Sequence, residues 1–363
     1  MARPSGAIIH LDNIAHNFRL AQQLTASGDC IAVVKANAYG HGMVEIAQHL
    51  SSMAKAYAVC SCEEAGQLRL HGIEQPILLL EGPFAADDVL FAAEHGCWLT
   101  IADESQLTTL AHSRPVTPLT IFLKVDTGMH RLGIAIDRVP VVLEQLRSMA
   151  QVMGEPILMT HFGCADEPSH PVMLQQLKAI DKLHDTTGLA LSSANSAAIV
   201  TGRGRGDRWS RPGIMLYGAE PLLQANDHTR QLRPAMSLLS EVIALREVAA
   251  GDSVGYGAAW TAARNSRIAT VAIGYADGYP RGARNGTPVY IEGKECPLAG
   301  RVSMDMICVD VTDAPHVAIG SEVELWGQRL SIDIVAAHAN TISYELTARM
   351  PMRTPRIYRS GEA

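Results

Sequence analysis

CIAVVKANAYGHG (residues 30–42) is a short apolar run that ends in a lysine and continues into a glycine-rich turn. The run shows no alternation of polar and apolar residues, which is typical of a strand buried on both faces. Similar runs recur along the chain, and amphipathic segments such as MVEIAQHLSSM (43–53) and PVMLQQLKAIDKLHD (171–185) separate them. The other apolar runs occupy residues 56–61, 76–82, 97–102, 119–126, 156–162, 189–195 and 214–218.

Eight strand–helix units in the first two-thirds of the chain predict an α/β domain, a (β/α)8 barrel of the TIM type. A doubly wound open sheet is the alternative that this spacing leaves open. One predicted helix, residues 61–72, begins with Ser61 and has Glu64 three residues later, which predicts a capping box at its start.

The character of the sequence changes after Pro234. Segments rich in β-branched residues then alternate with Gly, Asp and Pro, and IEGKE (residues 291–295) predicts a hairpin turn. We therefore expect the barrel at residues 1–230 and a second, all-β domain at residues 231–363.

Composition excludes several classes of function. The net charge of −7 argues against nucleic acid or an anionic membrane as a partner. The N-terminus shows no signal segment and no apolar run reaches transmembrane length, so we expect a cytoplasmic protein. The seven cysteines are scattered and odd in number, which predicts reduced thiols. His161, Cys164, Asp166 and His170 match no standard zinc spacing, so we expect no metal.

Polar side chains follow the predicted strands, at the end of a barrel where reactive groups gather. Lys35 stands at the end of the first strand, and a partly desolvated lysine there is a candidate Schiff-base nucleophile. Together with Arg131 and Arg211 it indicates an anionic ligand, a phosphate or a carboxylate. GRGRGD (residues 202–207) has no strand directly before it and no GK[ST] after it, so we expect a surface loop. The other strand ends carry Glu81, Lys124, Asp126, His161, Asn195, Ser196 and Tyr217.

Nine stretches in order along the whole chain resemble the alanine racemases, a family with a (β/α)8 barrel followed by a β domain. The segment around Lys35 looks like the one that carries pyridoxal 5′-phosphate (PLP) on a lysine in that family. The nine stretches are VVKANAYGHG, KVDTGMHRLG, THFGCADEP, ANSAA, RPGIMLYG, VGYGAAW, AIGYADGYPR, GRVSMDM and ISYELTAR.

The resemblance implies a PLP-dependent racemase that interconverts L-alanine and D-alanine and supplies D-alanine for peptidoglycan. Racemisation removes the α-proton from one face of the substrate and returns a proton to the other, which two bases can perform. The resemblance implies that Lys35 binds the cofactor as a Schiff base and is one base. Tyr256, from the other subunit of a homodimer, would be the second base.

The resemblance also assigns roles around these two bases. Arg211 would meet the pyridine nitrogen, and His161 would link Arg211 to Tyr256. Arg131 would approach the cofactor's phenolic oxygen and the substrate carboxylate, and Lys124 matches a position that is often carbamylated and then braces Arg131. The N–H of Met304 would also hold the substrate carboxylate. Tyr275 would narrow the entrance to the pocket, and Asp166, Arg281 and Arg301 would line it. The residues that would hold the phosphate are Tyr39, Asn195, Ser196, Gly213, Ile214 and Tyr344.

Other functions stay open at this point. Serine or another small amino acid could be the substrate, because a single hydroxyl is worth only about 1–3 kcal/mol in such a pocket. A fold-related PLP decarboxylase should be longer and carry a late catalytic cysteine, which Cys296 and Cys308 fit poorly. A non-enzymatic PLP-binding homeostasis protein should lack the β domain. The sequence does not separate a biosynthetic from a catabolic role.

Overall fold

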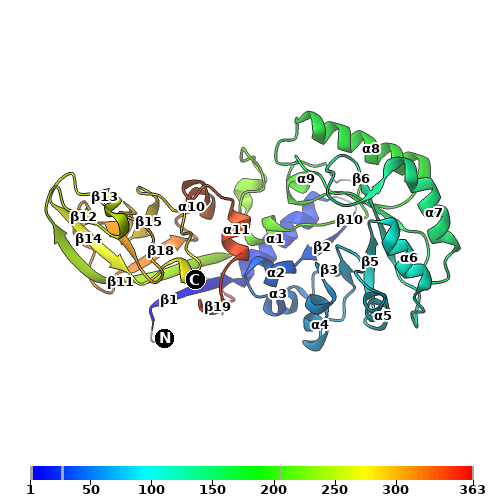
Figure 1. The fold of residues 1–363 in the computed structure, drawn as a ribbon, viewed down its shortest axis with the longest axis horizontal. Coiled ribbons are helices and arrows are strands. Elements are labelled where there is room, and N and C mark those ends of the chain that lie inside the picture. The colour runs from blue at the N-terminus through cyan, green and yellow to red at the C-terminus, as the bar shows by residue number, and fades with distance from the viewer. Residues whose placement is uncertain (1–2, 26–27, 204–205, 362–363) are drawn as a thin grey trace.

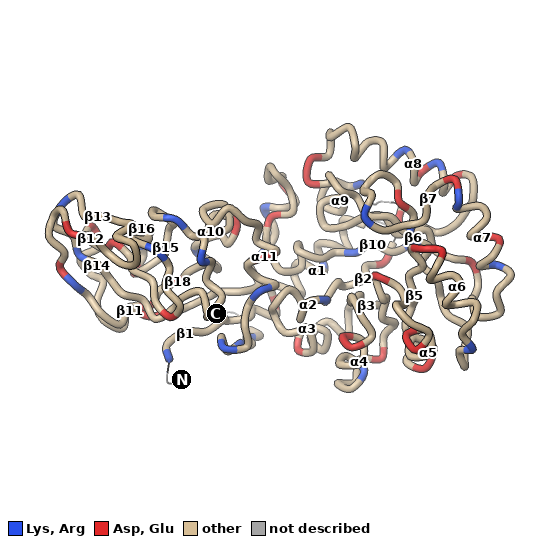
Figure 2. Tube along the Cα trace, viewed as in Figure 1, with Lys and Arg blue, Asp and Glu red and all other residues tan. Residues whose placement is uncertain are grey.

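The computed structural model describes all residues except 1–2, 26–27, 204–205 and 362–363. It confirms the predicted order of domains, a parallel barrel with outer helices and a β-rich domain beside it (Figure 1). Figure 2 shows basic and acidic residues interspersed along both parts of the molecule.

Eight parallel strands form the barrel, in the spatial order β10-β2-β3-β4-β5-β6-β8-β9. The backbone N–H groups of Arg208 and Arg211 donate to Leu191 O and Ala194 O, so the two ends of this order are joined and the barrel is nearly closed. The open-sheet alternative is therefore wrong. The strands are β2 (Asp29–Val33), β3 (Ala56–Val59), β4 (Ile77–Leu79), β5 (Cys97–Ile101), β6 (Ile121–Asp126), β8 (Ile157–Met159), β9 (Leu191–Ser192) and β10 (Trp209–Ser210).

The eighth predicted strand, residues 214–218, is wrong. This run forms the 3-10 helix η2 (Ile214–Tyr217), and the eighth strand is β10 instead. All four residues of η2 are buried, and the Tyr217 hydroxyl donates to Val33 O at 2.9 Å. A short apolar run fits a buried helical turn as well as a strand, so the pattern could not separate the two. As a consequence Arg211 follows the eighth strand, at the carboxyl end of the barrel, and does not precede it.

Helices cover the outside of the barrel, and the three segments that the sequence predicted as helical form α3 (Met43–Leu50), α4 (Cys62–Leu70) and α8 (Pro171–Thr187). The predicted capping box is wrong, because the Ser61 side chain makes no cap hydrogen bond. Glu64 instead accepts from Ala36 N at 2.7 Å and from Cys60 N at 2.8 Å, so it ties together the ends of β2 and β3. The barrel helices include α1 (Leu11–Leu24), α3 (Met43–Leu50), α4 (Cys62–Leu70), α5 (Ala86–Glu94), α6 (Glu104–His112), α7 (Val139–Ser148), α8 (Pro171–Thr187) and α9 (Ser196–Val200).

The second domain is built on a mixed sheet, and its β15–β16 hairpin confirms the turn predicted at IEGKE. Its central strand β11 pairs with β1, β14 and β18, so the first strand of the chain lies in the second domain. A division near residue 230 stays a proposal, with β1 as an exception to it. The strands are β1 (Ser5–His10), β11 (Met236–Val248), β12 (Ser253–Val254), β13 (Trp260–Thr261), β14 (Ser266–Val271), β15 (Pro288–Ile291), β16 (Lys294–Pro297), β17 (Ile307–Asp310), β18 (Glu322–Trp326) and β19 (Arg356–Arg359), with helices α10 (Ile332–His338) and α11 (Ser343–Ala348).

The turn after β2 has an unusual backbone. Residues 36–39 all have φ between +50° and +54°, which makes α2 (Lys35–Tyr39) a left-handed turn without glycine. Left-handed geometry costs about 1–2 kcal/mol per L-residue, so other groups must hold the turn. Glu64 binds its first N–H, the His41 imidazole contacts Ala38 O and Tyr39 O at 3.1 and 2.8 Å, and Arg356 Nε donates to Gly40 O at 2.6 Å.

Replacing Glu64 with alanine should destabilise the fold, because the N–H groups of Ala36 and Cys60 lose their shared acceptor. We expect the free energy of unfolding, measured by urea denaturation, to fall by about 1–3 kcal/mol. Glu63→Ala is the control, since Glu63 lies in the same first turn of α4 and binds neither N–H. Equal losses in the two variants would contradict this role of Glu64.

Candidate active site

A cavity of about 660 Å3 opens at the carboxyl ends of the barrel strands. Its polar walls come from β6, from the segments that follow β2, β4, β6, β8, β9 and β10, and from α11 of the second domain, so the fold brings together groups that are distant in sequence. The lining residues include Lys35, Tyr39, Glu81, Lys124, Arg131, His161, Asn195, Ser196, Arg211, Gly213, Ile214 and Tyr344.

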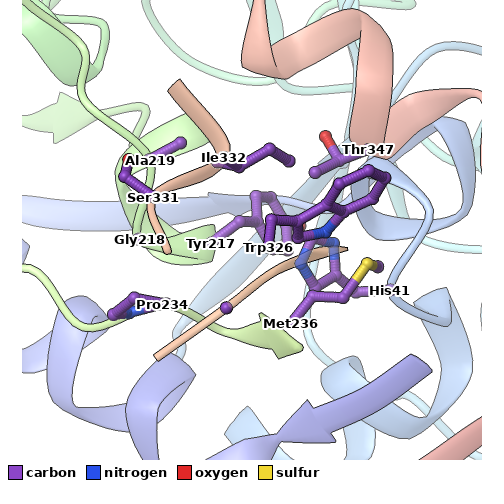
Figure 3. Close-up of a pocket in the computed structure, with 11 residues that line it drawn as sticks. His41, Tyr217, Gly218, Ala219, Pro234, Met236, Trp326, Ser331, Ile332 and Thr347 are labelled. Carbon is purple, nitrogen blue, oxygen red and sulfur yellow. The ribbon is translucent and has the colours of Figure 1, made fainter. Parts of the chain in front are cut away.

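A second cavity lies where the barrel meets the second domain (Figure 3). Its volume is about 20 Å3, room for a single water molecule, so it cannot hold a cofactor. His41 and Trp326 contribute to its wall. The His41 ring stacks on Tyr217 with centroids 4.5 Å apart, and Tyr217 stacks on Tyr39 at 4.8 Å. This column of rings supports Tyr39 from behind.

The large cavity is strongly cationic. Lys35, Lys124, Arg131 and Arg211 line it together with the carboxylate of Glu81. Burial, and then the charges of Arg211, Arg131 and Lys35, lower the pKa of Lys124 to about 8. Such a concentration of positive charge attracts a ligand that carries more than one negative charge.

His161 lies among the same cations. Burial, followed by the charges of Arg211, Lys124 and Arg131, lowers the pKa of His161 to about 3. The imidazole is therefore neutral at physiological pH, and it can accept a hydrogen bond at one nitrogen while it donates at the other.

The guanidinium of Arg211 is 5% exposed and is fixed by neutral oxygens. Nη1 donates to Ser192 O and, at 2.6 Å, to Ser192 Oγ, while Nη2 donates to Thr160 O at 2.5 Å. Burial lowers the pKa of Arg211 to about 10. Because these bonds use Nη1 and Nη2, Nε is the nitrogen that the described chain leaves to donate into the cavity. A neutral ring nitrogen is a suitable acceptor for this donor.

Another part of the wall offers donors for a phosphate. Ser196 Oγ accepts from Gly213 N at 2.9 Å, and the Asn195 side chain accepts from Ala198 N at 3.1 Å. A Cβ on Gly213 would lie 2.6 Å from the Tyr39 hydroxyl, so glycine is required for that hydroxyl to approach. Burial raises the pKa of Tyr39 to about 12, which keeps the hydroxyl protonated as a donor. Hydroxyl donors in a cationic cavity fit the phosphate of PLP.

Six of the predicted site residues do not line this cavity: Tyr256, Tyr275, Met304 and the three predicted entrance residues Asp166, Arg281 and Arg301. Tyr256, Tyr275 and Met304 belong to the second domain, where they are 71%, 41% and 52% exposed. None of them lines the cavity of the same chain. In Figure 1 the part of the domain that carries β12 and β13, which flank Tyr256, lies at the far end from the barrel.

Sequence reasoning missed a buried acid beside the site. Asp207 ends the stretch that was predicted as a surface loop, residues 202–207, two of which lie outside the described residues. It is 3% exposed, and its carboxylate accepts from the backbone of Ser193 and Ala194. An acidic residue two positions before the short strand β10 was the one available signal. Elsewhere in the described residues no cluster of His, Cys, Asp and Glu could bind a metal ion, and no helix could cross a bilayer.

Comparisons with known proteins agree with the geometry. Residues 9–221 match the family described as alanine racemase, N-terminal domain, and residues 235–358 match its C-terminal domain. The chain is 46% identical to the alanine racemase of Pseudoalteromonas atlantica, over 99% of each chain. It resembles the crystal structure of biosynthetic alanine racemase from Pseudomonas aeruginosa with TM-score 0.95 and 45% identity, over 99% of this chain and 100% of that one. The structure from Bartonella henselae, with covalently bound pyridoxal phosphate, gives TM-score 0.86 and 31% identity, over 98% of this chain and 99% of that one.

Lys124 should form a carbamate with dissolved CO2, because only an uncharged amine attacks CO2. With a pKa of about 8, compared with about 10.5 for an exposed lysine, Lys124 is largely uncharged at about pH 9. The anionic product would lie in the same cavity as the guanidinium of Arg131.

Carbon-13 NMR after incubation with labelled bicarbonate should show a carbamate signal that weakens as the pH falls through about 8. The signal should vanish in Lys124→Arg and persist in Lys55→Arg, which changes a largely exposed lysine. A signal that survives in Lys124→Arg would show that Lys124 is not the site.

Proposed function

This chain belongs to the alanine racemase family, whose PLP-dependent interconversion of L-alanine and D-alanine it carries out, and we propose that the barrel-mouth cavity is where this occurs. The observation that carries the proposal is the meeting of Lys35, the Arg211 guanidinium and the donors near Gly213 in one cavity. The relatives of high sequence identity are alanine racemases, so they do not support a decarboxylase or a serine racemase.

We propose that Lys35 binds PLP covalently and that Tyr39, Asn195, Ser196, Gly213, Ile214 and Tyr344 hold its phosphate. PLP, when bound, delocalises the charge left on the α-carbon after proton removal, so the protein has to supply bases and electrostatics. Arg211 would support this chemistry by donating from Nε to the pyridine nitrogen. A carboxylate in this place would stabilise the protonated ring, whereas a cation would keep the ring nitrogen unprotonated and limit side reactions.

Two bases would act on opposite faces of the substrate. Lys35 exchanges the proton on one face, and Tyr256 of a second subunit exchanges it on the other. His161 is neutral, and it would bridge Arg211 to the Tyr256 hydroxyl and help that hydroxyl to give and take a proton. The exposure of Tyr256 on its own chain supports a role on another chain.

The substrate carboxylate would bind Arg131 and the backbone N–H of Met304. Lys124, once carbamylated, would brace Arg131, and Tyr275 would narrow the entrance so that a methyl side chain fits best. Because Met304 and Tyr275 are exposed in the second domain, this part of the pocket also requires a second copy of the chain.

We therefore propose a homodimer with two equivalent composite sites, working in the cytoplasm on a precursor of peptidoglycan. All seven cysteines are free, which suits a reducing compartment.

The covalent attachment of PLP can be tested directly. Borohydride reduction of the holoenzyme should fix the cofactor on the peptide that carries Lys35, because reduction turns the Schiff base into a stable secondary amine. Lys35→Ala should lose the label, and Lys124→Arg should keep it on Lys35. A label on Lys124, or on no lysine, would refute the proposed site.

A further inference from the structure

The loop before β10 contains a buried acid that the roles above do not use. Asp207 Oδ2 accepts from Ser193 N at 2.6 Å and from Ala194 N at 2.7 Å, and Oδ1 accepts from Ser193 Oγ at 2.8 Å. Its own carbonyl is closely packed, since a Cβ on Gly28 would lie 2.1 Å from Asp207 O. Close packing thus fixes the backbone of Asp207, and its carboxylate in turn fixes the backbone of residues 193–194.

The same dipeptide is held from its other side by Arg211. The backbone N–H of Arg211 donates to Ala194 O at 2.9 Å, and Nη2 lies 3.5 Å from Ser193 O. Asn195 and Ser196 follow immediately, so the position of these two phosphate-binding residues depends on how residues 193–194 are fixed.

Asp207 and Arg211 are also an opposite pair of buried charges, only four residues apart. Each hydrogen bond that the guanidinium makes within the described chain goes to a neutral oxygen. Burial lowers the pKa of Arg211, and the charge of Asp207 acts in the opposite direction; burial also raises the pKa of the Asp207 carboxyl. The other charged or titratable groups that share the cavity with Arg211 are Lys35, Tyr39, Glu81, Lys124, Arg131, His161 and Tyr344.

We propose that Asp207 is a positioning residue of the cofactor site, whose hydrogen bonds fix residues 193–196 for the phosphate and whose charge stabilises the charged form of Arg211. This inference rests on the proposed function, because it takes residues 195 and 196 to be phosphate ligands. The two effects are separable. In Asp207→Asn the amide oxygen can take the place of Oδ2, and the Ser193 hydroxyl can turn to accept from the amide NH2. That variant keeps three hydrogen bonds and loses only the charge.

The test compares wild-type holoenzyme with Asp207→Asn, Asp207→Ala and the control Asp29→Asn. Asp29 begins β2 and lies beside the same segment, since its N–H donates to Arg208 O and its carboxylate contacts Arg208 and Lys55, but it bonds neither N–H of residues 193–194. Equilibrium dialysis gives the dissociation constant of PLP, and kcat/KM for alanine is measured against pH.

We expect Asp207→Ala to bind PLP at least about tenfold more weakly, because two buried N–H groups lose their acceptor. Asp207→Asn should bind it within about threefold of wild type. Its loss of kcat/KM at alkaline pH should begin at lower pH than in wild type, because Arg211 gives up its proton more easily. Asp29→Asn should match wild type in both measurements.

Unchanged PLP binding in a folded Asp207→Ala would overturn the positioning role. If kcat/KM of Asp207→Asn falls at the same alkaline pH as that of wild type, the proposed effect of the Asp207 charge on Arg211 is wrong. Should Asp207→Ala fail to fold, Asp207→Asn decides alone, and a tenfold loss of affinity in that variant also refutes the proposal. A wild-type protein without PLP would instead refute the proposed function itself.

Discussion

The site depends most on one buried charge, the guanidinium of Arg211. Moving a charge out of water is costly unless hydrogen bonds replace its hydration. Here the replacement comes from oxygens at the ends of two different strands, Thr160 after β8 and Ser192 in β9, while Arg211 itself follows β10. These strands must therefore end at the same level. Closing the barrel brings together the oxygens that bind Nη1 and Nη2, and Nε is the nitrogen left to donate into the cavity.

The excess of positive charge in the cavity follows from the same arrangement. Lys35, Lys124, Arg131 and Arg211 share it with Glu81, and their mutual repulsion contributes to the low pKa of Lys124 and of His161. A cofactor that carries a phosphate and a substrate that carries a carboxylate both relieve this repulsion. The repulsion among these cations therefore favours the binding of anionic ligands. A neutral His161 can accept and donate hydrogen bonds in the cavity without adding to its positive charge.

Much of this could be read from the sequence, because unalternating apolar runs and helical periods reflect burial directly. Seven of the eight strands overlap predicted runs, and most of the residues at their ends meet in one cavity, although Asp126 and Tyr217 do not line it. The eighth strand was missed because β10 has two residues and the more apolar run beside it forms η2. Nothing local marks residues 36–39 as left-handed, since contacts from Glu64 and Arg356 impose that geometry. Asp207 was missed because its partners, Ser193 and Ala194 after β9, are brought to it only by barrel closure.

The central claim is that Lys35 and Tyr256 of different subunits complete one site, and mixed dimers test it most directly. Lys35→Ala and Tyr256→Phe homodimers each lack one base in both sites. Random pairing after co-refolding makes about half of the dimers mixed, and each mixed dimer has one intact and one doubly defective site. The account predicts recovery to about a quarter of wild-type racemase activity. Activity no higher than that of the separate variants would mean that Tyr256 serves its own subunit, and would contradict the composite site.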